Sequence, residues 1–89
     1  MRLLLTRSAQ RDLMRLREFI AEKNPGSAGR ISRRLLSIIK RLADQPRLGV
    51  TIEELPDTRE LIVGDYIVRY LVNGDEIYIL RIWHGREHR

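Results

Sequence analysis

Three β-rich segments close together near the C-terminus constrain the fold most. Residues 58–63, 66–72 and 76–83 are rich in Ile, Val, Leu and Tyr, and only Gly64-Asp65 and the Asn73-Gly74 region separate them. Asn-Gly between such runs is a strong hairpin signal, because both residues tolerate the positive φ of a type I′ turn. The segments therefore predict an antiparallel meander.

The middle segment shows that the two faces of this sheet differ. Ile67, Arg69 and Leu71 alternate with a second set of side chains that is entirely apolar or aromatic. This second set is Tyr66, Val68, Tyr70 and Val72. Successive side chains of a strand point to opposite faces, so we expect one face to pack against the rest of the chain.

Two amphipathic helices precede the meander. Ala9, Leu13, Leu16 and Ile20 recur at helical spacing, with Phe19 beside them, and predict a helix that ends near Glu22. Thr6 or Ser8 can cap its first turn. Asn24-Pro25-Gly26 then breaks the chain.

A second helix follows the break. Its apolar stripe is Ala28, Ile31, Leu35, Ile38 and Leu42, and the cations opposite are Arg30, Arg33, Arg34, Lys40 and Arg41. With a short strand at Leu3–Leu5, the order is β-α-α-β-β-β. We expect an α+β fold in which an antiparallel helical hairpin packs on one face of a small, mainly antiparallel sheet, as one domain over residues 1–89.

Composition removes several classes of function. There is no cysteine, only two histidines, and no phosphate-loop or dinucleotide fingerprint, so we expect no metal, no cofactor and no small-molecule substrate. The apolar run at the start is too short for a signal peptide or a membrane span. We therefore expect a cytoplasmic protein without a membrane partner.

The net charge of +5 is unevenly distributed. Residues 1–49 hold 12 basic and 4 acidic side chains, a balance of +8, whereas residues 50–89 have a balance of −3. Such a positive half attracts polyanions or acidic proteins. The alternative is a solvated face that keeps a small protein soluble.

Several polar residues near the last strands are candidates for chemistry. They are Glu53, Glu54, Arg59, Arg69, Arg81, His84 and Arg86. A guanidinium can hold a phosphate, and a histidine can move a proton at neutral pH, so Arg, His and Glu together suit RNA cleavage through the 2′-hydroxyl. The structural alternative is pairing across strands, for example of Arg69 or Arg81 with Glu60.

In combination, the motifs resemble the RelE/ParE toxin superfamily over nearly the whole chain. The motifs are Ala9-x-x-Asp12-Leu13, Asn24-Pro25-x-x-Ala28, Pro46-x-x-Gly49, Glu54-Leu55-Pro56, Arg59-Glu60-Leu61, Gly64-Asp65-Tyr66-Ile67-Val68-x-Tyr70 and Ile79-Leu80-Arg81-Ile82-Trp83-His84-Gly85-Arg86. The resemblance implies the toxin of a type II toxin–antitoxin (plasmid stabilisation) system, with a cognate antitoxin as partner.

The resemblance is closer to the ParE branch, whose members inhibit DNA gyrase without catalysis of their own. This branch implies no catalytic residues. We expect the target to be bound by basic and aromatic side chains at the C-terminal end of the sheet. These are Arg59, Arg81, Trp83, His84 and Arg86.

The RelE branch is the alternative, and its members cut mRNA at the ribosome. That resemblance would give catalytic roles to Glu54, Arg59, His84 and Arg86. Only three residues follow Arg86, so the late tyrosine of many nuclease members is absent, and both lysines lie in the helices. A third alternative is a degenerate module that binds an antitoxin without toxicity.

Overall fold

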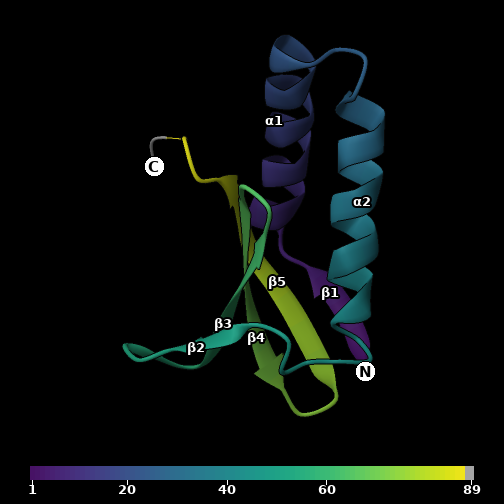
Figure 1. Cartoon of the computed structure of the whole chain (residues 1–89). Coiled ribbons are helices and arrows are strands. Elements are labelled where there is room, and N and C mark those ends of the chain that lie inside the picture. The colour runs from purple at the N-terminus through teal and green to yellow at the C-terminus, as the bar shows by residue number, and fades with distance from the viewer. Residues whose placement is uncertain (88–89) are drawn as a thin grey trace.

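The computed structural model describes residues 1–87 and confirms a two-layer α+β fold (Figure 1). Its elements are β1 (Arg2–Leu5), α1 (Arg7–Lys23), α2 (Ala28–Arg41), β2 (Val50–Ile52), β3 (Leu55–Val63), β4 (Tyr66–Asn73) and β5 (Glu76–His84). Compared with the prediction, the chain has one additional strand, β2, which pairs with the start of β3. Within the described residues, no helix is long and apolar enough to cross a membrane.

The strands form one sheet in the order β1-β5-β4-β3-β2. β3, β4 and β5 pair antiparallel as a meander, and β1 returns parallel to β5. β3 and β5 both run antiparallel to the strand between them, so they point in the same direction. Figure 1 shows α1 and α2 side by side over one face of this sheet, while the β2–β3 hairpin projects from its far edge.

The core lies between the helices and that face. Val68 and Tyr70 of β4 are fully buried, and Leu16 of α1 and Leu35 of α2 pack in the same cluster. The predicted difference between the faces of the middle strand is therefore confirmed. The stripe predicted for α2 omitted Ile39, which is among the most buried residues of this helix.

The structure decides two local features of the prediction. Thr6, one of the two predicted caps, caps α1, since its hydroxyl oxygen accepts the amide hydrogen of Ala9 at 3.0 Å. The predicted type I′ turn at Asn73-Gly74 is wrong: Asn73 still pairs with Glu76, so the turn is Gly74-Asp75. Only Gly74 has a positive φ there, which is the type II′ pattern.

Candidate target-binding site at the C-terminal end of the sheet

A pocket of about 410 Å³ opens where the helical hairpin meets the end of the sheet. Its floor is apolar and aromatic, and its rim carries cations from both helices and from the segment after β5. The lining residues include Phe19, Ile20, Lys23, Ile31, Arg34, Leu35, Val63, Asp65, Tyr66, His84 and Arg86. The pocket thus combines an apolar depression with a basic rim.

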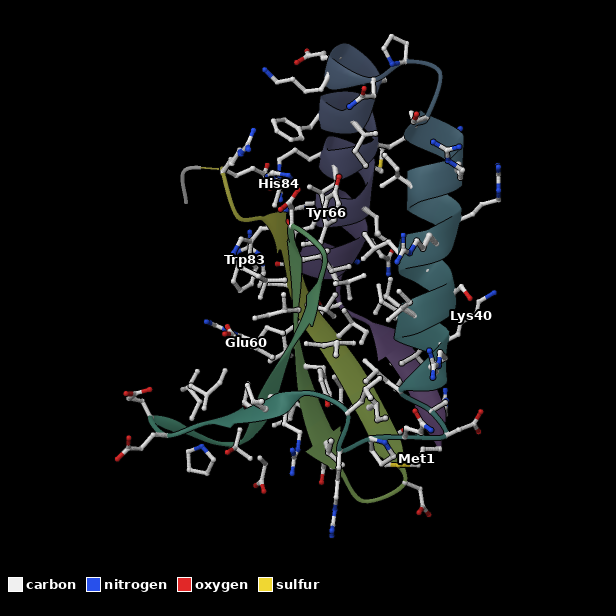
Figure 2. The ribbon with its side chains drawn as sticks, in the orientation of Figure 1. Met1, Lys40, Glu60, Tyr66, Trp83 and His84 are labelled. Carbon is white, nitrogen blue, oxygen red and sulfur yellow. The ribbon has the colours of Figure 1, made fainter. Side chains whose placement is uncertain are left out.

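His84, the last residue of β5, forms one wall of this pocket and is only 8% exposed. Its ring packs 5.2 Å from the ring of Phe19 and, edge to face, 5.0 Å from that of Tyr66. Figure 2 shows Tyr66 and His84 close to one another at this end of the sheet. Its Nδ1 accepts the amide hydrogen of Arg86 at 3.0 Å, so the proton of the neutral ring is on Nε2, which lies 3.9 Å from the Asp65 carboxylate. Nδ1 is therefore engaged by the backbone of Arg86, whereas Nε2 lies beyond hydrogen-bond distance of Asp65.

The bond to His84 fixes the turn that carries Arg86. The amide of Glu87 also donates to the His84 carbonyl at 2.9 Å, which closes a short turn over residues 84–87. Arg86 is exposed at this turn, and none of the described ion pairs involves it. A hydrogen-bonded turn that presents an exposed guanidinium suits the recognition of an anionic or polar surface.

The turn is anchored to α1 through Arg15. Its Nε and Nη2 donate to the two carboxylate oxygens of Glu87 at 2.7 and 3.1 Å. The same guanidinium also donates to the Ile82 carbonyl and pairs with Asp12. Arg15 thereby joins the helix, the end of β5 and the segment beyond it.

Asp12 is the buried centre of this network, with 2% of its surface exposed. It accepts the Ile82 amide at 2.8 Å and the Nε of Arg81 at 2.8 Å. Burial opposes its charged form, but the bonds from Arg81, Ile82 and Arg15 outweigh that effect, and the pKa of Asp12 lies below its ordinary value. The hydrogen bond from Arg15 likewise lowers the pKa of Glu87.

These contacts close an open sheet edge. β5 has β4 along one side, but β1 on its other side pairs only with residues 76–79. On that other side, the second half of β5 has no neighbouring strand. Side chains satisfy its outward backbone groups instead: Thr6 donates to Leu80, Asp12 and Arg15 bind Ile82, and Glu87 accepts from His84. An edge paired in this way is protected from adding a foreign strand.

The expectation that Arg59 lies with His84 at the C-terminal end of the sheet is wrong, and Glu54 of the RelE alternative does not lie beside them either. His84 pairs with Tyr66, whereas Arg59 pairs with Tyr70 four residues further along β4 and one strand beyond it. Strand geometry separates Arg59 from His84 by roughly 15 Å. Arg59 donates to the Gly49 carbonyl at 2.7 Å, and Glu54 is exposed in the β2–β3 turn.

The other predicted binding residues have structural partners. The guanidinium of Arg81 bonds to Asp12, rather than to Glu60. Glu60 instead accepts from Arg69, as the structural alternative expected, with 2.9 and 2.6 Å to one carboxylate oxygen. Trp83 is only 4% exposed and lies beneath the Arg69 guanidinium, 5.3 Å from the ring centre. Among the five predicted contacts, Arg86 is thus the most available to a target.

Asp12, Arg15 and Glu87 organise this site and were not among the residues predicted for it from the sequence. A signal for Asp12 was present, since it falls three residues after Ala9 and four before Leu16, inside the buried stripe of α1. A carboxylate in such a stripe needs a buried donor. In residues 1–87, no three His, Cys, Asp or Glu side chains are grouped as metal ligands are.

Known proteins share both the sequence and the fold. A family model described as the ParE toxin of type II toxin–antitoxin systems matches residues 3–89. In Caulobacter vibrioides, toxin RelE1 is 33% identical, with 91% of this chain and 89% of that protein covered. Toxin ParE3 of the same organism is 34% identical, with 96% and 87% covered.

Solved structures of known toxins have a similar fold. A chain of the chromosomal ParDE system of P. aeruginosa has a TM-score of 0.82 at 27% identity, and the match covers 94% of this chain and 95% of that one. A chain of the RelB–RelE complex of Methanococcus jannaschii has a TM-score of 0.65 at 24% identity, with 93% and 91% covered, and supports the fold alone. The fold is thus that of the RelE/ParE toxin superfamily. The chain belongs to the ParE toxin family of type II toxin–antitoxin systems.

Proposed function

We propose that this toxin inhibits DNA gyrase by binding it, and that a cognate antitoxin neutralises it. The observation that carries the proposal is the separation of Glu54 and Arg59 from His84, together with the exposed Arg86 at a hydrogen-bonded turn. An inhibitor that acts by binding needs such an anchor and needs no converging acid, base and phosphate ligand.

His84 bears most directly on the nuclease alternative. A general base must reach the substrate proton with a free nitrogen. The Nδ1 of His84 is occupied by the Arg86 amide, and the ring is packed between Phe19 and Tyr66. These contacts fit a residue that positions Arg86 better than one that transfers protons.

The pocket at the end of the sheet is our candidate for the antitoxin. Its apolar floor can receive an apolar side chain, while Lys23, Arg34 and Arg86 on the rim can pair with carboxylates. The P. aeruginosa relative is part of a ParDE toxin–antitoxin system. We therefore expect an adjacent reading frame whose product has an acidic, amphipathic segment.

Purified protein should inhibit the supercoiling of relaxed plasmid by gyrase and leave ribosome-bound mRNA intact. Arg86→Ala should raise the half-inhibitory concentration about 10-fold or more, as expected for a central anchor. Arg11→Ala is the matched control, because it removes the same charge from an exposed site on α1 and should change inhibition less than twofold.

The nuclease alternative predicts the opposite results. Message would be cut in the ribosomal A site, and Arg59→Ala or His84→Gln would reduce cleavage about 100-fold or more if these groups act on the transition state. If mRNA is cleaved while supercoiling is unaffected, the proposed function is wrong and the protein is a ribosome-dependent mRNA endonuclease. Inhibition of neither process, in a protein that still binds its antitoxin, would identify the degenerate module.

A further inference from the structure

The outer face of α2 is made almost entirely of cations. The helix has six exposed residues, and Ser37 is the only one without a positive charge. The others are Arg30, Arg33, Arg34, Lys40 and Arg41. At 3.6 residues per turn these five side chains fall within an arc of about 120° and extend over about 16 Å of the helix axis. Figure 2 shows Lys40 on the side of α2 that faces away from the sheet.

These five cations are not neutralised within the described part of the protein. α2 contains no acidic residue, and none of the ion pairs in residues 1–87 includes any of the five. The cation nearest the start of the helix, Arg30, donates to the Ser27 hydroxyl at 3.2 Å, which leaves its charge uncompensated. Like charges at helical spacing repel one another and destabilise the helix, and a bound polyanion would remove this repulsion.

Away from Arg34, which also borders the pocket at the end of the sheet, the face is the wrong chemistry for a protein partner. The centres of protein interfaces are depleted in charged residues and are built around buried apolar or aromatic anchors. The apolar side chains of α2 are buried or only partly exposed, so an acidic protein docked on the other four cations would desolvate them without burying an exposed apolar anchor. Phosphate groups remain hydrated when they are bound, and arginine, which supplies four of the five cations, pairs with them through two parallel bonds.

We propose that the outer face of α2 binds the phosphate backbone of duplex DNA. A duplex carries one negative charge per about 1.7 Å of its axis, so a 16 Å row of cations meets more phosphates than it can neutralise. Binding to single strands depends on aromatic side chains that stack on bases, and this face has none. The inference goes beyond gyrase inhibition, although a toxin that holds DNA would be concentrated where gyrase acts.

The test measures fluorescence anisotropy of a labelled duplex of about 20 base pairs with the purified toxin and no gyrase. Binding should weaken with salt, with a slope of log K against log salt of up to about −4.5 if all five cations contact phosphates. The triple variant Arg30→Gln/Arg33→Gln/Arg41→Gln should reduce this slope to about −2. Glutamine has nearly the helix propensity of arginine, so the variant should fold, and a thermal melt checks that it does.

The matched control is Arg7→Gln/Arg11→Gln/Arg17→Gln, which removes the same charge from exposed positions of α1. Its slope should stay within about one unit of the unmodified protein. An equal reduction of the slope in both triple variants would contradict a site on α2. The absence of duplex binding at about 50 mM salt would contradict it as well. Tighter binding to polyglutamate or to a single strand than to the duplex would overturn the choice of ligand. Because gyrase is absent, these results are independent of the inhibition assay.

Discussion

Asp12→Ala tests whether the buried network holds α1 to the end of β5. The substitution removes the acceptor of the Ile82 amide, and leaving that buried group unpaired costs about 1–3 kcal/mol. It also removes the partner of Arg81, but that side chain is 46% exposed and can hydrate, so this loss adds at most about 1 kcal/mol. We expect the free energy of unfolding to fall by about 3 kcal/mol, which lowers the Tm of a domain this small by about 12–24 °C.

The assay is thermal unfolding followed by circular dichroism at neutral pH. Asp12→Asn keeps an oxygen for the Ile82 amide while losing the charge, so it should unfold between the Ala variant and the unmodified protein. Glu18→Ala, on the exposed side of the same helix, is the control and should change stability by less than about 0.5 kcal/mol. A Tm for Asp12→Ala within about 3 °C of the unmodified protein would refute the network as the main link between helix and strand.

Three further predictions concern turns, packing and pH. Gly74→Val places a β-branched residue at a φ of +60° and should destabilise by about 1–3 kcal/mol; an unchanged Tm would mean the turn is misassigned. Gly49→Ala brings a Cβ to 2.8 Å from both the Tyr70 side chain and the Glu60 carbonyl oxygen and should cost about 1–3 kcal/mol in urea unfolding, whereas a neutral result would show that the ring and the backbone both move aside freely. Asp12 and Glu87 have lowered pKa values in the folded state, so their contribution is present above their unfolded values and is lost as pH falls through the folded ones. Stability should thus decline below about pH 4.5, and Asp12→Asn should flatten that decline; an equally steep decline in the variant would exclude Asp12 as a source.

Periodicity was sufficient to predict the helices and the three long strands. The spacing of the apolar residues distinguishes helix from strand. Leu16 and Ile20 of α1 are four residues apart, as on one face of a helix, whereas Val68 and Tyr70 of β4 are two apart, as on one face of a strand. β2 was missed because three residues are too few for a pattern, and Val50 and Thr51 are exposed. Its pairing depends on the neighbouring β3 rather than on its own sequence.

The site was harder to predict because it depends on strand direction. Arg59 lies in the middle of β3 and His84 at the end of β5, and these strands run in the same direction, so Arg59 lies four residues back from the level of His84 and two strands away. The meander already implied this geometry, and it implied Tyr66 as the neighbour of His84. The network of Asp12, Arg15 and Glu87 required the three-dimensional structure, since its members are up to 75 residues apart in the sequence.

The most direct test of gyrase inhibition is to compare DNA synthesis with protein synthesis after the toxin is induced without its antitoxin. Cells would be pulse-labelled with thymidine and with methionine at short intervals after induction, and Arg86→Ala would serve as the weakened variant. Our account predicts that thymidine incorporation falls first while methionine incorporation continues, and that Arg86→Ala delays this fall. An immediate arrest of methionine incorporation with continued DNA synthesis would contradict it.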